Sequence, residues 1–172
     1  MADETSLLID LTEQMLAAAR QAGAEAADAI AVSGSAIGID VRKGGLEHAE
    51  RSEATEIGLR VLLDRRQAIV SGSDLCIETL STMAERAVAM AKAAPEDAYC
   101  GLAEPEQLAK DTDNTALELQ DPTAEPEAAV LQQDALAAEE AAQSVQGITQ
   151  IEAASAGYGR NQVWMQSSNG FS

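Results

Sequence analysis

The chain has 172 residues, a length that suits one domain or slightly more. Hydrophobic residues make up 46% and aromatic residues only 2%, so a core can form but must be largely aliphatic, and a base-stacking surface for single-stranded nucleic acid is excluded. The 29 acidic residues outnumber the 11 basic ones, and the net charge of -18 argues against binding to phosphate backbones or to anionic membranes.

The first predicted element is a helix over about 7–22. Its apolar residues recur three or four positions apart, which is the spacing of one helix face, and Gly23 is a natural C-terminal stop. The residues of this face are Leu8, Leu11, Met15, Ala18, Ala19 and Ala22.

Residues 28–72 then alternate between apolar and polar positions, which predicts an antiparallel sheet of about five strands. Turns are indicated at Lys43-Gly44-Gly45 and at Asp64-Arg65-Arg66. The segment Leu46–Ser52 is polar throughout, so we expect an edge strand or a strand with both faces in water.

A second helix is predicted over about 74–94, capped by Ser73 or Asp74 and ended by Pro95. An acidic linker follows over 96–125, and a third helix over about 126–146. Residues 96–140 contain 13 Asp or Glu and one Lys, which we interpret as a solvated linker and helix face. The alternative is a dedicated cation-binding or DNA-mimicking surface.

The last predicted element is a strand pair between Ile151 and Gln166, turning at Gly159-Arg160-Asn161. An Asn-Gly turn signal at Asn169-Gly170 is followed by only two residues, so we expect the natural chain to continue beyond Ser172.

The fold class is therefore α+β, with the curved antiparallel sheet at 28–72 packed by the helices at 7–22 and 74–94. We divide the chain into an N-terminal domain at 1–95, an acidic linker at 96–125, and a helix plus strand pair at 126–172 that begins a truncated region.

The sequence offers no catalytic or metal-ligating set. His48 is the single histidine, and Cys76 and Cys100 match no metal spacing, whereas a catalytic zinc usually has three protein ligands. A Cys–His nucleophilic pair is chemically open, because Cys76 falls in the first turn of a predicted helix where the dipole would lower its pKa. The simpler interpretation is two reduced thiols and a solvated histidine.

The cellular location follows from further absences. No stretch approaches the ~18 uninterrupted apolar residues of a transmembrane helix. The N-terminus is acidic where a signal peptide would be basic. We therefore expect a cytoplasmic protein.

The polar strand is the candidate binding surface. An edge strand presents unpaired N–H and C=O groups, so an extended peptide or a partner strand could add to it by backbone hydrogen bonds. The other interpretation is that its charges only guard the edge against aggregation. The candidate docking residues are Leu46, Glu47, His48, Ala49 and Glu50.

An ordered set of short segments resembles the TldD/PmbA family, also known as modulators of DNA gyrase, and more closely its PmbA (TldE) branch. The segments are VRKGGLE (41–47), IGLRVLL (57–63), AIVSGSDL (68–75), AVAMAK (87–92), APED (94–97), GLA (101–103) and SSNGFS (167–172). No single segment is a catalytic signature, so the resemblance depends on their order along the chain.

The resemblance implies a zinc-dependent peptidase complex, in which a TldD-like subunit and a PmbA-like subunit enclose a chamber and cleave unfolded peptides. The zinc motif, His-Glu-x-x-x-His, belongs to the TldD subunit and does not occur here. We therefore expect this chain to hold no cofactor, to be non-catalytic by itself, and to assemble with a TldD-like subunit that carries the zinc.

Two other functions stay open from the sequence. One is an acidic interaction module that acts on a basic DNA-binding partner, suggested by the charge of residues 96–140. The other is a self-sufficient peptidase, against which the single histidine weighs.

Overall fold

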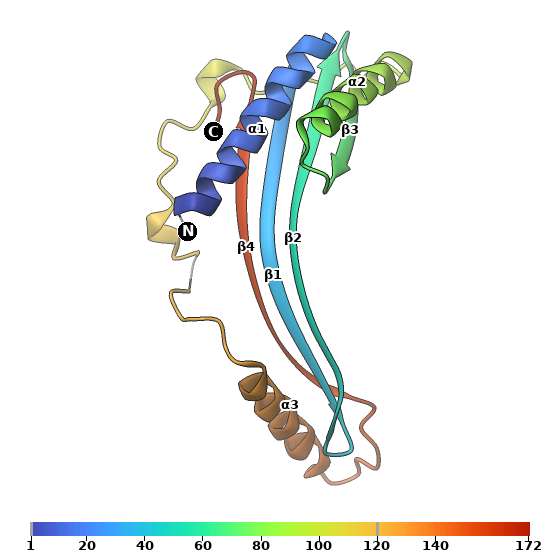
Figure 1. Cartoon of the computed structure of the whole chain (residues 1–172), viewed down its shortest axis with the longest axis vertical. Helices are drawn as coiled ribbons and strands as arrows, with labels where there is room; N and C mark the ends of the chain where they lie inside the picture. Colours follow the sequence, from blue (N-terminus) through green and yellow to red (C-terminus); the bar gives the residue numbers. More distant parts are fainter. Residues whose placement is uncertain (1, 120) are drawn as a thin grey trace. The chain divides into compact units, whose positions relative to one another are not determined.

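The computed structural model describes residues 2–119 and 121–172. Its strands form a four-stranded antiparallel sheet in the order β3-β2-β1-β4 (Figure 1), and the predicted α+β class is confirmed. The elements in chain order are α1 (Ala2–Ala22), β1 (Ala26–Arg42), β2 (Gly45–Leu63), β3 (Arg66–Gly72), α2 (Ile77–Ala93), α3 (Ala128–Gln143) and β4 (Ala154–Ser167), with short 3-10 turns at Pro105–Gln107 and Thr115–Leu117.

The strands are longer and fewer than the sequence suggested. Three strands cover 26–72 where about five were expected, and β4 is one strand where a terminal pair was expected. No turn interrupts these strands: Gly34 in β1, Glu53–Glu56 in β2 and Gly159 in β4 all lie within continuous strand, and none has a positive φ angle. Positive φ angles mark reversals at Lys43-Gly44 and Asp64-Arg65, as two-residue hairpin turns require.

The start of α2 also differs from the expected cap. Cys76 is the N-cap, and Asp74 stabilises the turn before it by accepting hydrogen bonds from the Cys76 N–H at 3.1 Å and the Thr79 hydroxyl at 2.8 Å. These bonds favour the ionised carboxylate and lower the pKa of Asp74. Ser73 therefore is not the cap, and Asp74 acts two residues earlier than a cap would.

The chain divides into two compact units, each built from separate segments. The first comprises residues up to Ser33, Ala54–Asp113 and Gln162–Ser172, and the second comprises Gly34–Glu53 and Asn114–Asn161. Because β1, β2 and β4 contribute residues to both units, chain order alone does not reveal this division. The division at residues 95 and 125 concerned successive domains and stays a prediction.

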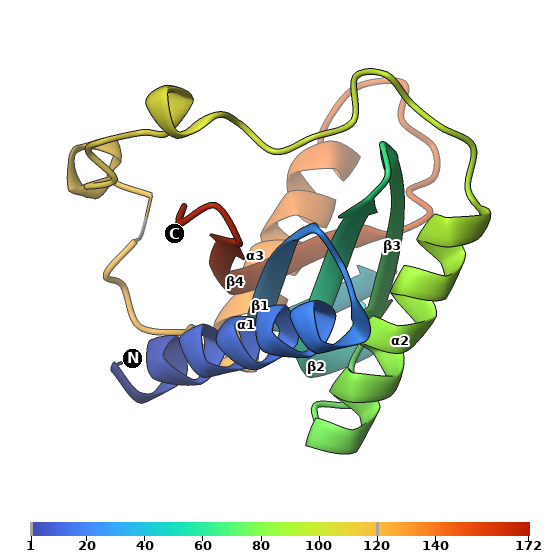
Figure 2. The same ribbon diagram turned by 90° about the horizontal axis from the view of Figure 1, so that it is seen from above.

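The core of the first unit is aliphatic and rich in alanine. Helices α1 and α2 cover one face of its part of the sheet (Figure 2). Small alanine side chains on both the strands and α2 permit close packing of helix on sheet, and Trp164 packs against this core as a partly buried residue. The buried members are Leu8, Leu11, Met15, Ala19, Ala27, Ala29, Ala31, Ile57, Leu59, Val61, Ala68, Leu80, Met83, Ala84, Ala87, Val88 and Ala91.

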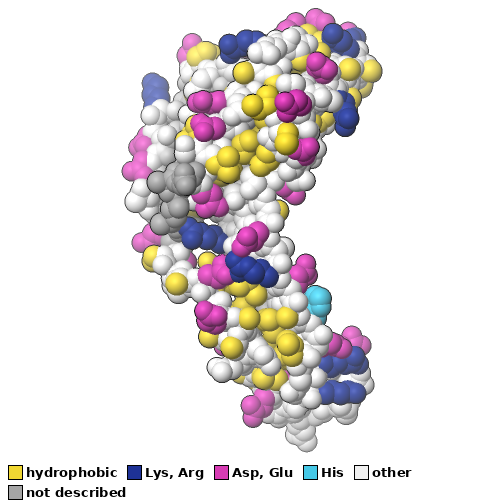
Figure 3. All heavy atoms as spheres, viewed as in Figure 1, with side chains coloured by type: hydrophobic (Ala, Val, Ile, Leu, Met, Phe, Trp, Pro, Cys, Tyr) yellow, Lys and Arg dark blue, Asp and Glu magenta, His cyan; other side chains and the backbone are white. Residues whose placement is uncertain are grey.

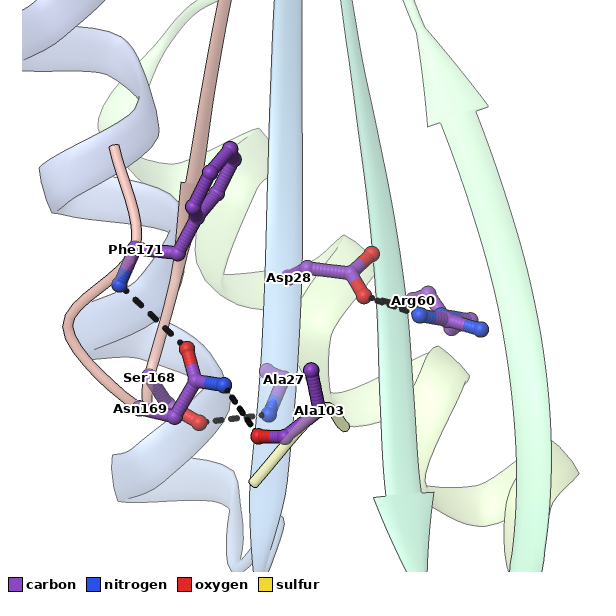
Figure 4. Close-up of polar contacts among 7 residues, drawn as sticks. All are labelled: Ala27, Asp28, Arg60, Ala103, Ser168, Asn169 and Phe171. Carbon is purple, nitrogen blue, oxygen red and sulfur yellow. Dashed lines mark hydrogen bonds and ion pairs between the residues drawn. The ribbon is translucent and has the colours of Figure 1, made fainter. Parts of the chain in front are cut away.

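The turn after β4 is held by several hydrogen bonds (Figure 4). Ser168 accepts from the Ala27 N–H at 3.0 Å through its Oγ and donates its own N–H to the Ala27 oxygen at 2.8 Å. Asn169 donates its side-chain amide to the Ala103 oxygen at 2.9 Å and accepts from the Phe171 N–H at 3.3 Å. The predicted turn at Asn169-Gly170 is confirmed, with Gly170 at φ 93°.

Beside this turn, Arg60 and Asp28 form an ion pair between neighbouring strands (Figure 4). The Asp28 carboxylate, which lies 2.9 Å from the Arg60 Nε, raises the pKa of the guanidinium. Asp28 is buried, so this pairing offsets the cost of placing its charge out of water.

Two surface properties of the described residues concern charge and hydropathy. Acidic side chains are spread over the visible face of the molecule (Figure 3). Among residues 2–119 and 121–172, every helix is too short or too polar to cross a bilayer.

The first unit's core makes a direct stability prediction. Met15 is fully buried, whereas Met90 is 45% exposed on α2. Met15→Ala should lower the free energy of unfolding by about 2–5 kcal/mol, because it removes buried contacts and leaves a cavity. The matched Met90→Ala should change it by less than about 1 kcal/mol. Urea unfolding followed by the fluorescence of Trp164, which packs against this core, measures both. Equal effects of the two substitutions would contradict the packing described.

Candidate functional site

The N-terminal half of β2 has an unpaired side. Strand β3 pairs with β2 only from Ile57 to Leu63, where Ile57 lies opposite Gly72, the last residue of β3. Residues Gly45–Glu53 of β2, which belong to the second unit, therefore have β1 as their only neighbouring strand among the described residues. Every second residue of this segment directs its N–H and C=O away from β1. We call Gly45–Glu53 the open edge.

Side chains of the open edge are exposed on both faces of the sheet. The polar strand expected at Leu46–Ser52 is therefore present, although it is the first half of a long strand and not a separate edge strand. Several of its charged side chains are in surface ion pairs, such as Glu47 with Arg42 at 3.3 Å, and the His48 ring lies 3.6 Å from the Glu50 carboxylate. Such exposed pairs add little to the free energy of unfolding. Their charged side chains make this part of β2 a polar surface.

Arg51 links the open edge to the connector that precedes α3. Its guanidinium pairs with Glu125 and Glu53. Both carboxylates raise the pKa of Arg51, and Glu125 has the larger effect. No backbone hydrogen bond joins 45–53 to the connector among the described residues. The connector is thus held at this side chain while the backbone groups of the edge stay unpaired.

A cavity of about 360 Å³ lies next to the open edge, wholly within the second unit. Its apolar part comes from strands β1 and β2 and from Pro126, and its polar part from three carboxylates and one guanidinium. The lining residues are Ile37, Ile39, Ala49, Glu50, Arg51, Glu125, Pro126, Glu127 and Ala128. With Glu50, Glu125 and Glu127 against Arg51, the lining carries a formal net charge of -2.

Helix α3 supports the strands behind this cavity. Its residues Leu131 and Ala135 pack with Ile37, Ile39 and Val41 of β1. One turn further along the same face, Glu139 is only 3% exposed, and its carboxylate accepts hydrogen bonds from the Lys43 N–H at 2.6 Å and the Gly44 N–H at 2.8 Å. The helix thereby fixes the β1–β2 turn from which the open edge starts.

Sequence analysis identified the open edge but not its surroundings. It named Leu46, Glu47, His48, Ala49 and Glu50, which the structure places side by side on β2. It missed the cavity and Glu139, although a signal was present: Leu131, Ala135 and Glu139 are four residues apart and share one helix face. Docking at these residues stays a prediction.

The histidine and the two cysteines considered for a nucleophilic pair belong to different units. His48 belongs to the second unit, and Cys76 and Cys100 belong to the first. The expectation that a helix dipole lowers the pKa of Cys76 is wrong, because the thiol bonds to the Asp74 carboxylate, which raises that pKa. In the described part of the chain, no three His, Cys, Asp or Glu side chains converge to hold a metal ion, so these residues do not fit a zinc site.

Comparison with known proteins gives one family match. Residues 27–91 match the sequence model of the family described as "PmbA/TldA metallopeptidase domain 1". This range includes most of β1, all of β2 and β3, and most of α2. No curated protein matches the chain.

Solved structures share the fold at low identity. A TldE structure from Thermococcus kodakarensis has a TM-score of 0.70 at 15% identity, covering 93% of this chain and 35% of its own. A structure from Bacteroides thetaiotaomicron, described as a candidate modulator of DNA gyrase, has a TM-score of 0.66 at 19% identity, covering 94% and 37%. One with a similar description from Thermotoga maritima has 0.61 at 12%, covering 94% and 35%. The chain thus spans little more than a third of their length.

The buried carboxylate of α3 can be tested by itself. Glu139→Gln leaves one acceptor for two N–H groups, so one buried donor loses its partner, which costs about 1–3 kcal/mol. We expect faster hydrogen exchange at the Lys43 and Gly44 amides and no such change in the exposed neighbour Glu140→Gln. Unchanged exchange at both amides in Glu139→Gln would show that this contact does not hold the turn.

Proposed function

We propose that this chain, whose residues 27–91 match the first domain of the PmbA/TldA metallopeptidases, is the N-terminal, non-catalytic region of a PmbA-like subunit in a zinc peptidase complex of the TldD/PmbA family. In this proposal it assembles with a TldD-like subunit, helps to shape the chamber, and contributes to the processing of unfolded peptides in the cytoplasm. The observation that carries the proposal is the family match over 27–91, which includes all of β2 and therefore the open edge.

The chemistry of the chain supports a role in assembly. The described residues bring together no set that fits zinc, so the proposal assigns the metal and the hydrolytic step to the partner subunit. What the chain does offer is a long strand with unpaired backbone groups and side chains exposed on both faces. Such a surface suits contact with another polypeptide better than it suits catalysis.

One further function has a specific observation in its favour. Two similar structures carry descriptions that mention DNA gyrase, and the net charge of -18 suits a basic partner. An acidic module of that kind would bind its partner with a steep dependence on salt. It would do so without a TldD-like subunit, which separates it from the assembly role.

The proposed function predicts how zinc and activity distribute between subunits. Co-expressed with a TldD-like subunit of its own organism, the chain should co-purify with it, and zinc and peptide hydrolysis should be found in the complex. The chain alone should contain far less than one zinc ion per molecule and should not hydrolyse an unfolded peptide such as reduced casein fragments. Metal analysis, size-exclusion chromatography and a peptidase assay provide the measurements.

Two results would contradict this proposal. Stoichiometric zinc in the isolated chain, with hydrolysis that a chelator abolishes, would make it a peptidase in its own right. Failure to associate with the TldD-like subunit, together with salt-sensitive binding to a basic DNA-binding protein, would favour the acidic module.

A further inference from the structure

We propose that the open edge of β2 and the adjoining cavity bind an extended segment of an unfolded polypeptide that carries Lys or Arg. The segment adds to β2 as a strand, and one of its cationic side chains enters the cavity. The inference rests on the proposed function for its occupant, and it deepens that function by naming the class of peptide.

The backbone provides the first part of the argument. Among the described residues, the side of β2 away from β1 along Gly45–Glu53 has no strand partner and no backbone hydrogen bond to the connector. An extended peptide satisfies these groups by antiparallel or parallel pairing, irrespective of its sequence. Nine residues of edge are enough for a peptide of about five residues, the usual length of a strand.

The cavity provides the second part. Ala49, Glu50 and Arg51 belong to both the open edge and the cavity lining, so a strand added there has side chains within reach of the cavity. A volume of about 360 Å³ is enough for one long side chain. The wall formed by Ile37, Ile39 and Pro126 suits an aliphatic stem, as in Lys and Arg.

Charge selects among extended peptides. The open edge carries Glu47, Glu50 and Glu53 against Arg51, and Glu127 in the cavity has no cationic partner in the described part of the chain. A Lys or Arg head at the cavity meets Glu50 and Glu127, whereas an acidic side chain is repelled. A second copy of this chain is disfavoured as occupant, because each copy carries -18.

The test uses the 172-residue chain and three short peptides, followed by NMR shifts of its amides and by titration calorimetry. The probe is acetyl-Thr-Lys-Val-Lys-Thr-amide, in which alternation places both lysines on one face. Its acidic control replaces both lysines by glutamate. Its backbone control keeps the lysines but is methylated at the amide nitrogens of the three central residues, so it cannot pair as a strand.

We expect the lysine peptide to shift the amides of Leu46–Ser52 and those around Glu127, and to bind more weakly as salt increases. The glutamate and methylated peptides should leave these amides unchanged. The double variant Glu50→Gln/Glu127→Gln should weaken binding of the lysine peptide about 3- to 10-fold, the effect of two exposed charge pairs. The matched double variant Glu78→Gln/Glu85→Gln, which makes the same charge change on exposed positions of α2, should bind like the original chain.

Three outcomes would overturn the inference: no shift at Leu46–Ser52, equal binding of the methylated peptide, or equal binding in the two double variants. If the lysine peptide does not bind but the TldD-like subunit co-purifies, the peptide site is wrong and the proposed function stands. If the peptide binds as described but no TldD-like subunit associates, the site stands and its role in a peptidase complex is wrong.

Discussion

The difference in length between β2 and β3 determines most of what is distinctive in this protein. Strand β2 has 19 residues and β3 has 7, so β3 can pair with only the second part of β2. Backbone groups of the first part must then be solvated or bound by another chain, because an unpaired group out of water is costly. The sequence of that part follows this constraint, since Glu47, Glu50 and Glu53 keep both faces of the strand in water.

A strand with a single partner needs support from elsewhere, and in the second unit α3 provides it. The helix packs Leu131 and Ala135 on β1, which is the one neighbour of the open edge, and Glu139 binds the turn between the two strands. A buried carboxylate usually destabilises, but here both of its oxygens accept backbone N–H groups that the turn would otherwise leave without partners. The open edge can therefore be exposed and polar while its conformation stays fixed.

The sequence pattern predicted which segments form helices and strands, but it did not predict that neighbouring strand segments join into long strands. The hairpin turns were predictable because Lys43-Gly44 and Asp64-Arg65 reverse the chain between clear alternating runs. The sequence also contains glycines at which the chain does not reverse. A Cβ on Gly34 would lie 3.2 Å from the backbone oxygen of Arg160 and 2.2 Å from the side-chain oxygen of Asn161, so glycine at this position permits close approach of the neighbouring strand. That reason depends on contacts across the sheet, which one sequence does not display. The same holds for the cavity, whose walls come from residues about 75 positions apart, such as Arg51 and Glu125.

The two parts of the candidate site differ in their relation to the family. The open edge lies inside residues 27–91, the range that matches the sequence model of the first PmbA/TldA metallopeptidase domain. Glu125, Pro126 and Glu127 lie outside that range, and they provide the acidic wall of the cavity. Backbone pairing depends on β2, whereas a preference for cationic side chains depends on the connector. We therefore expect a change of charge in the connector, at Glu127 for example, to alter which peptide side chains the site favours while leaving backbone pairing along Gly45–Glu53 intact.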